Sequence, residues 1–172
     1  MSYPVSMKSK AALPVEEYLH TSFPDLDKEY RDGELVERAL PDYLHSKTQG
    51  LLILLLGALR KTFSVFVCPE LRVRVRPGLI RIPDVSVFYP NEPQERVPSA
   101  PPFIAIEILS LDDRMANVRN KLAEYRAWGV PHVWLVDPHS QRMYTWDAGL
   151  TEVAMLKIPE LGIEVTPADI FE

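Results

Sequence analysis

Two acidic residues inside apolar segments are the feature of this sequence that most clearly suggests chemistry. Asp84 opens the apolar segment 85–88, and Glu107 lies within the apolar run 103–109. An ionised carboxylate that loses its water must be compensated by a cation, a metal ion or hydrogen-bond donors. If the strands that carry them are neighbours, both side chains share a face and form a hard-oxygen site suited to Mg²⁺. In the alternative interpretation Asp84 binds local turn donors and Glu107 pairs with an arginine.

A cation for the same site is available on the next expected element. Lys121 lies four residues after Asn117 and four before Tyr125, on the flank of the apolar stripe of a predicted helix. From there it can orient a water or stabilise the charge that develops in phosphoryl transfer. The alternative is an ordinary solvated lysine on a helix surface.

The pattern of the chain predicts elements that would position these three residues. The nearly all-apolar run 103–109 is typical of a central strand covered on both faces, and residues 133–136 repeat that pattern. Between them we expect a helix that Asp112 or Asp113 caps and that Gly129 ends. A helix that joins two buried strands is a candidate right-handed crossover.

Shorter signals complete the predicted order of elements. They are a short helix after Pro14, a hairpin at Asp32-Gly33, a long leucine-rich helix from Asp42 to about Phe63, an alternating strand over 66–76, a strand over 79–89 interrupted at Pro83, a hairpin over 143–156 and a helical turn over 167–171. This order predicts a mixed α/β (α+β) fold with a central mixed β-sheet flanked by helices, in a single domain of residues 1–172 whose core spans about 14–165.

Composition limits the kind of protein this is. With 172 residues, 47% of them hydrophobic and 25% charged, the chain is expected to form one domain that folds without disulfide bonds or a structural metal ion. The single cysteine, Cys68, excludes an intramolecular disulfide framework and a cysteine-rich zinc site. The longest apolar run, residues 51–59, is too short for a membrane span, which needs about 20 residues. Met1 to Lys10 lack the apolar region of a secretory signal, so we expect a cytoplasmic location.

The charge distribution argues against a general nucleic-acid binder but leaves a local basic surface. The net charge of −5 repels polyanions. Within residues 60–81, however, basic residues dominate, and Arg72, Arg74 and Arg76 would project from one face of the alternating strand. There they would contact the backbone phosphates of DNA. The alternative is a solubilising or dimer-facing strand edge.

Several short strings, specific only together and in this order, carry a resemblance to a known family. They are Pro83-Asp84, Glu107-x-x-Ser110, Lys121 and Gly129-Val-Pro-x-x-Trp-Leu-Val-Asp-Pro138, with Asp32-Gly-Glu-Leu35 and His45 earlier in the chain. In these strings the sequence resembles the Uma-two group, a large bacterial family of restriction endonucleases in the PD-(D/E)XK nuclease superfamily. The similarity spans about Pro14 to Asp137.

The resemblance implies a restriction-endonuclease-like fold and a Mg²⁺-dependent endonuclease that hydrolyses phosphodiester bonds of DNA, with Mn²⁺ able to substitute. It makes Asp84 and Glu107 metal ligands, with the backbone carbonyl of Ile108 a third, Lys121 the lysine of the site and Glu34 an added acid. Leu109 stands where the superfamily pattern has a lysine, and the family is understood to have moved that lysine to the following helix, which Lys121 matches. We also expect a homodimer, because two symmetric sites cut two strands most simply.

Two other functions remain open on the sequence. The net acidity and Leu109 also suit a catalytically inactive module that keeps the nuclease fold for binding or regulation. A third function is hydrolysis of RNA or of a smaller phosphodiester. The sequence contains no glycine-rich phosphate loop and no Gly-x-Ser-x-Gly motif, which disfavours nucleotide-dependent reactions and a serine hydrolase.

Overall fold

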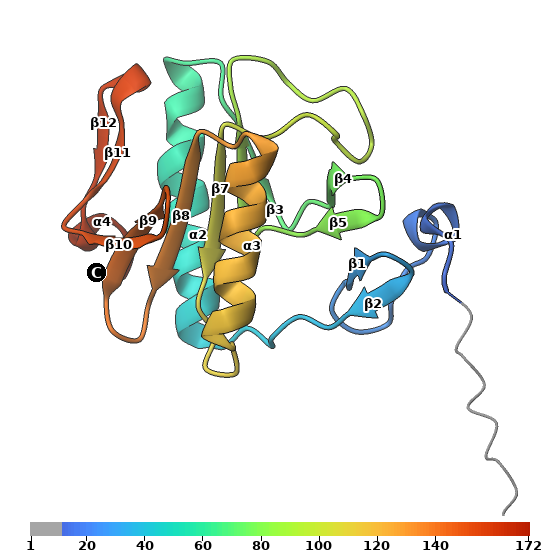
Figure 1. The fold of residues 1–172 in the computed structure, drawn as a ribbon. Coiled ribbons are helices and arrows are strands. Elements are labelled where there is room, and N and C mark those ends of the chain that lie inside the picture. The colour runs from blue at the N-terminus through green and yellow to red at the C-terminus, as the bar shows by residue number, and fades with distance from the viewer. Residues whose placement is uncertain (1–11) are drawn as a thin grey trace, which may run out of the picture.

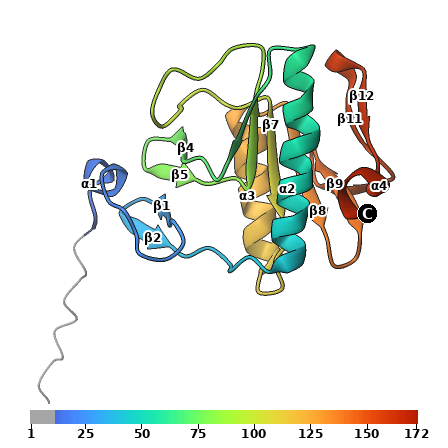
Figure 2. The ribbon, with the colours of Figure 1, turned by 180° about the vertical axis from the view of Figure 1, so that it is seen from behind.

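A mixed β-sheet with one long helix on each face forms the body of the molecule. The computed structural model describes residues 12–172, so the expectation that Met1 to Lys10 carry no secretory signal falls outside the described residues. The sheet has six strands in the order β10-β9-β8-β7-β6-β3, and Figures 1 and 2 show α2 and α3 on its opposite faces. The strands are β3 (Phe66–Pro69), β6 (Val85–Phe88), β7 (Ile104–Ile108), β8 (His132–Asp137), β9 (Arg142–Trp146) and β10 (Leu150–Val153).

The two covering helices have different roles in the chain. Helix α2 (Tyr43–Ala58) continues as a short 3-10 turn over Leu59–Lys61, and helix α3 (Met115–Trp128) is the crossover between β7 and β8. These two strands are parallel, and β6 is antiparallel to β7. The arrangement confirms the predicted mixed α/β class, the long leucine-rich helix and the helix that joins two buried strands.

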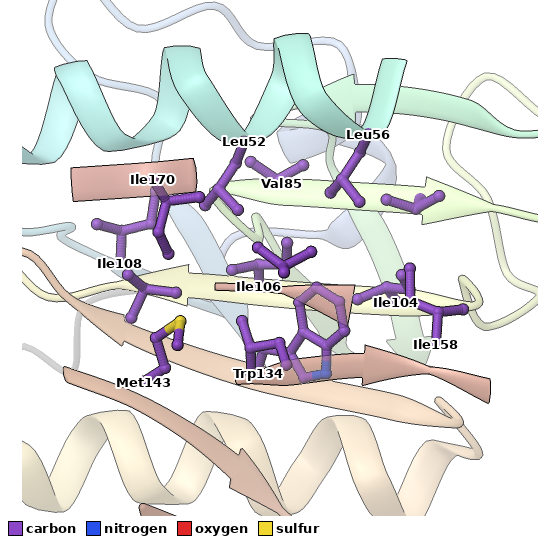
Figure 3. Packing of buried hydrophobic residues seen from close by; sticks show 14 of the residues in the cluster. Leu52, Leu56, Val85, Ile104, Ile106, Ile108, Trp134, Met143, Ile158 and Ile170 are labelled. Atoms are coloured by element: carbon purple, nitrogen blue, oxygen red, sulfur yellow. The ribbon is translucent and has the colours of Figure 1, made fainter. Parts of the chain in front are cut away.

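The alternation of β7 decides which side chains reach which face of the sheet. Its even-numbered isoleucines pack with the fully buried Leu52 and Leu56 of α2 (Figure 3). Ala105 belongs instead to the apolar cluster beneath α3. Because successive side chains of a strand point to opposite faces, Glu107 shares the α3 face with Ala105.

A smaller, four-stranded sheet stands beside α3, in the order β2-β1-β5-β4. Its strands are β1 (Glu29–Arg31), β2 (Glu34–Val36), β4 (Val73–Arg76) and β5 (Leu79–Arg81). The predicted hairpin turn joins β1 to β2, and Asp32 and Gly33 adopt the positive φ angles, 48° and 98°, that such a turn needs. On one face of this sheet Tyr30 and Ile80 pack with Tyr18 of the short helix α1 (Val15–Leu19).

The two long strands expected over 66–76 and 79–89 are each divided between the two sheets. Glu70, with a φ of 48°, separates β3 from β4, and the segment Ile82-Pro83-Asp84 separates β5 from β6. Pro83 has no N–H to give to a sheet ladder, so the chain leaves one sheet there and joins the other. The division places Asp84 at the point where β6 enters the main sheet.

The observed ends of α2 and α3 agree in part with the ends predicted from the sequence. Helix α2 begins after Asp42, whose Oδ1 accepts a hydrogen bond from the His45 N–H at 2.9 Å, and Gly129 ends α3 with a φ of 108°, both as predicted. The expected cap of α3 is wrong, because Arg114 is its N-cap residue and makes no side-chain capping bond. Asp113 instead accepts a bond from the Ser110 N–H at 2.8 Å and closes a turn ahead of the helix.

The C-terminal part closes the α2 side of the core. It comprises β11 (Leu156–Ile158), a 3-10 turn over Pro159–Leu161, β12 (Ile163–Val165) and α4 (Pro167–Phe171), which is the predicted helical turn. Leu156 and Ile170 are buried in the same cluster as Leu52. The hairpin expected over 143–156 ends earlier, with β10 at Val153. Within residues 12–172, no helix has both the length and the apolar composition that crossing a membrane requires.

Asp42 is expected to contribute measurably to stability through its cap of α2. Asp42→Ala removes the bond to the His45 N–H and the 2.9 Å contact of Oδ2 with His139 Nε2. We expect it to lower the free energy of unfolding, measured by urea denaturation, by about 1–2 kcal/mol. Asp112→Ala, at an exposed position before α3, is the control and should change that free energy by less than about 0.5 kcal/mol. Equal effects of the two substitutions would contradict the role of the cap.

Candidate active site

Asp84 and Glu107 lie opposite each other at the carboxyl end of β7. Val85 of β6 stands opposite Ile106 of β7, and one further step along the antiparallel register brings Asp84 opposite Glu107. Both residues are buried, with 5% and 7% of their surface exposed. Asp84 directly precedes β6, and its carboxylate contacts His45 of α2, whereas Glu107 contacts residues of α3. That the two acids hold one ion between them stays a prediction.

Three groups surround the Asp84 carboxylate. Its Oδ2 accepts a hydrogen bond from the Ile108 N–H at 2.7 Å and lies 3.4 Å from His45 Nε2. Its Oδ1 accepts a bond from Arg38 Nη2 at 3.2 Å. Burial by itself raises the pKa of Asp84, but the contact with His45 and the bond from Ile108 hold that pKa below its usual value. The carboxyl group is therefore ionised at neutral pH.

Glu107 binds two residues of α3. Tyr125 donates its hydroxyl to Oε1 at 2.7 Å, and Lys121 Nζ donates to Oε2 at 3.2 Å. Burial raises the pKa of Glu107 to about 7, and the negative charges of Asp84 and Glu29 act in the same direction against the opposing effects of Lys121 and Tyr125. Without a further cation this carboxyl group is only partly ionised at neutral pH.

A third buried acid, Glu29, joins the cluster from the small sheet. It is fully buried at the start of β1. Arg81 Nη1 donates to its Oε2 at 2.6 Å, and Lys121 Nζ lies 3.0 Å from its Oε1. Burial opposes ionisation, but Lys121 and Arg81 together hold the pKa of Glu29 below its usual value. Lys121 thus bridges two carboxylates, one from each sheet.

The structure does not bring Glu34 into this cluster and so corrects the position of the added acid. Glu34 begins β2 directly after the hairpin turn, and its side chain is exposed at that outer end. Glu29, on the paired strand, is the acid that faces α3. Both lie in the acid-rich segment 25–37, whose composition does not distinguish them. The usable signal was Arg81, a charged residue among apolar strand residues that needs a buried acid as its partner.

Lys121 lies where the sequence placed the cation of the site. Leu109 packs into the apolar cluster beneath α3, so the position two residues after Glu107 provides no cation. The Lys121 side chain reaches Glu107 from the helix instead. Burial favours the neutral amine, but Glu107 and Glu29 outweigh burial and hold the pKa of Lys121 above its usual value. The lysine is therefore charged at neutral pH.

Each of the three arginines expected to contact DNA is paired with an acid, and their contact with DNA stays a prediction. The acid-rich N-terminal region packs against the small sheet and supplies an acid to each of them. Arg72 is held most firmly, because its guanidinium binds both oxygens of Asp27 and lies 4.5 Å from the centre of the Tyr18 ring. The pairs are Arg72 with Asp27, Arg74 with Glu16 at 3.9 Å and Arg76 with Asp32 at 2.9 Å.

A cavity of about 340 Å³ leads to the acid cluster. Its lining includes the exposed first turn of α3 and the charged residues Glu29, Arg38, Arg81, Glu107, Arg114 and Lys121. Asp84 is not part of the lining, whereas Arg38, which binds it, is. The cavity therefore gives a ligand access to Glu107 and Lys121 and places Arg38 in front of Asp84.

The acid pair fits a Mg²⁺ ion by the chemistry of its donors. Mg²⁺ is commonly held by one or two carboxylates, while waters and substrate phosphates complete its shell, and Asp84 and Glu107 offer two such carboxylates. Among the described residues no group of three His, Cys, Asp or Glu side chains is placed so that it could hold a metal ion, so an ion here would need ligands besides the two carboxylates. Ile108 contacts Asp84 through its N–H, and its carbonyl remains a proposed third ligand.

The buried Glu107 should make stability depend on pH with a definite sign. Its pKa rises from the ordinary 4.5 to about 7 on folding, so between these values the folded state binds more protons than the unfolded state and stability falls as pH rises. Glu107→Gln keeps the shape and removes the charge. In EDTA we expect the variant to match the parent near pH ~5 and to exceed it at pH ~8 by about 1–3 kcal/mol in the free energy of unfolding, measured with urea.

The matched control is Glu34→Gln, which alters an exposed carboxyl group on the neighbouring hairpin. Its stability relative to the parent should be the same at both pH values. If Glu107→Gln is less stable than the parent by an equal amount at both pH values, the raised pKa of Glu107 is wrong.

Comparisons with known proteins bear on the fold and on the family. A putative nuclease from Anabaena variabilis has a crystal structure that matches with a TM-score of 0.79 and 21% sequence identity, over 91% of this chain and 96% of that one. No curated protein matches the chain. The family model of Uma2, described as "Putative restriction endonuclease", matches residues 15–171. Because that match extends over nearly the whole chain, this protein belongs to the Uma2 family, as the short strings of its sequence indicate.

Proposed function

We propose that this protein is a Mg²⁺-dependent endonuclease that hydrolyses phosphodiester bonds of DNA, with Mn²⁺ able to replace Mg²⁺. One observation carries the proposal: Asp84 and Glu107 are buried opposite each other, and Lys121 reaches Glu107 from α3. Such a concentration of buried acids costs stability, and a divalent ion bound between them would recover part of that cost. The family match supports the reaction class.

In the proposed reaction Asp84, Glu107 and the carbonyl of Ile108 would hold the divalent ion. When bound, the ion supplies Lewis acidity, which polarises a phosphoryl oxygen and makes water a stronger nucleophile. Lys121, which is charged at neutral pH, donates hydrogen bonds to the attacking water or to the phosphate. It thereby stabilises the negative charge that develops in the transition state.

Two further residues act through these groups as positioning residues. Glu29 holds the Lys121 ammonium at 3.0 Å, and the Tyr125 hydroxyl fixes one oxygen of Glu107 at 2.7 Å. Because Lys121 is shared between two acids, an ion at Glu107 would leave the ammonium anchored to Glu29 with donors free for the phosphate. The lysine keeps its place while its second partner changes.

We infer that DNA approaches along the first turns of α3. Arg114 and Arg119 are exposed there, and Arg114 lines the cavity that leads to Glu107. Cations that contact backbone phosphates give an affinity that falls with salt. The acid-paired Arg72, Arg74 and Arg76 remain a secondary proposal for phosphate contact. The free Cys68 suits the reducing cytoplasm in which we place the protein.

Nicking of supercoiled plasmid tests the assigned roles. With Mg²⁺ or Mn²⁺ the parent should nick plasmid, and EDTA should abolish nicking. Asp84→Asn, Glu107→Gln and Lys121→Met should each slow nicking at least ~100-fold, because each removes a metal ligand or a group that stabilises the transition state. Glu34→Gln is the control and should nick at the parental rate. Time courses resolved on agarose gels measure these rates.

Equal nicking by the parent and by Asp84→Asn would remove the assigned site. A parent that neither nicks plasmid nor binds Mn²⁺ in calorimetry would favour the non-catalytic binding module. A labelled RNA and a small phosphodiester in the same assay would decide the class of substrate.

We also propose a homodimer, because cleavage of both strands of a duplex needs two sites. Two exposed apolar side chains on α2 support this: Tyr43 is 77% exposed and Leu54 71%, and their spacing of about three turns places them on one side of the helix. Leu54→Glu should convert the dimer to a monomer in analytical ultracentrifugation, while Leu111→Glu, in an exposed loop, should not. A parent that is monomeric would contradict the proposal.

A further inference from the structure

Arg38 stands between the cavity and Asp84. It lies on the connection between β2 and α2 with 8% of its side chain exposed, and its Nη2 is 3.2 Å from Asp84 Oδ1. Arg38 lines the cavity and Asp84 does not. An ion that arrives through the cavity therefore meets the guanidinium before it meets the carboxylate.

The Asp84 oxygen that Arg38 occupies is also the one better placed for an ion. Oδ2 is committed to the Ile108 N–H at 2.7 Å and faces His45 at 3.4 Å, whereas the hydrogen-bond donor to Oδ1 is Arg38. A divalent ion held by Oδ1 would share that oxygen with the guanidinium, and the two cations would repel each other strongly. Binding of the ion therefore requires the guanidinium to leave.

The guanidinium has donors that are ready for another acceptor. Arg38 Nη1 is buried without a hydrogen-bond partner among the described residues, and the nearest oxygen of its ion-pair partner Glu70 is 3.7 Å away, beyond hydrogen-bond reach. A planar guanidinium donates two parallel hydrogen bonds to a phosphate. Arg38 is thus chemically suited to a phosphate oxygen.

The charges of the cluster favour the arrival of an anion together with the ion. Three buried acids, of which Glu107 is only partly ionised, face three permanent cations, so the cluster has no excess of negative charge before an ion binds. A divalent ion adds two positive charges, and the negative charge of a bound phosphodiester neutralises one of them. The ion pairs are Asp84 with Arg38, Glu29 with Arg81 and Lys121, and Glu107 with Lys121.

We propose that Arg38 is a catalytic residue that exchanges partners: it binds Asp84 until a divalent ion takes that carboxylate, and then binds a non-bridging oxygen of the scissile phosphate. The proposal rests on the proposed function and adds a residue to it. Arg38 makes and breaks only hydrogen bonds and stays protonated throughout. The exchange links the affinity for the ion to the presence of the substrate.

Arg38→Met tests the exchange because it should raise the affinity for Mn²⁺ and lower the rate of nicking. Methionine keeps an unbranched stem, and Asp84 retains its bond from Ile108 and its contact with His45. Without the competing cation, Mn²⁺ should bind about tenfold more tightly in calorimetry and should raise the melting temperature by more than it does in the parent. At saturating Mn²⁺, plasmid nicking should nevertheless fall at least ~100-fold in kcat.

Two further variants separate this role from a general loss of charge. Arg38→Lys keeps the charge but cannot donate two parallel bonds, so it should bind Mn²⁺ as the parent does and nick plasmid at an intermediate rate. Arg60→Met removes an exposed cation in the 3-10 turn that follows α2. It should leave the Mn²⁺ affinity unchanged.

Mn²⁺ binding by Arg38→Met that is no tighter than in the parent would overturn the exchange, as would nicking at the parental rate. A parent that binds no Mn²⁺ would overturn the metal dependence of the proposed function as well. If the parent binds Mn²⁺ and Asp84→Asn does not, a failure with Arg38→Met concerns Arg38 alone.

Discussion

The burial of three carboxylates in one place is the constraint on which the rest of this molecule depends. An unpaired buried carboxylate costs several kcal/mol, so each acid needs a permanent cation in contact with it. Lys121 meets this need twice, because it contacts Glu29 of the small sheet and Glu107 of the main sheet. The site can therefore form only when both sheets are docked on α3.

Helix α3 consequently serves the fold and the site together. Its apolar stripe covers the main sheet, while Glu124, one turn from Lys121, binds Arg31 at 2.5 Å and Arg81 at 2.8 Å on the small sheet. The same electrostatic contacts that join the two sheets thus orient the ammonium group that faces the cavity. The raised pKa of Glu107 shows that this compensation is incomplete, as is common where buried groups are arranged for function rather than for stability alone.

Local patterns in the sequence predicted part of this site and missed the part that depends on docking. Acids in apolar strands identified Asp84 and Glu107, and the flank of a helical stripe identified Lys121, because each of these signals lies within one element. Glu29 and Arg38 do not stand out within their own segments, since their contacts arise only where the small sheet and the connection after it meet α3 and β6. Arg81 indicated that a buried acid was needed but not which one. Alternation predicted a row of arginines that begins at Arg72, just before β4, but not that Asp27 covers this residue. The sequence showed that the expected strand over 79–89 is interrupted at Pro83. It did not show that the chain passes from the small sheet to the main sheet there.

The pairing of β6 with β7 is not fixed by a tight turn, because residues 89–103 separate the two strands. The register is held instead by the alternating side chains that α2 and α3 receive from each strand. A single residue inserted into either strand would turn its carboxylate to the opposite face of the sheet, whereas a change of length in the connecting loop leaves both carboxylates in place. Insertions and deletions can therefore accumulate in that loop during evolution, while the two strands must keep their length.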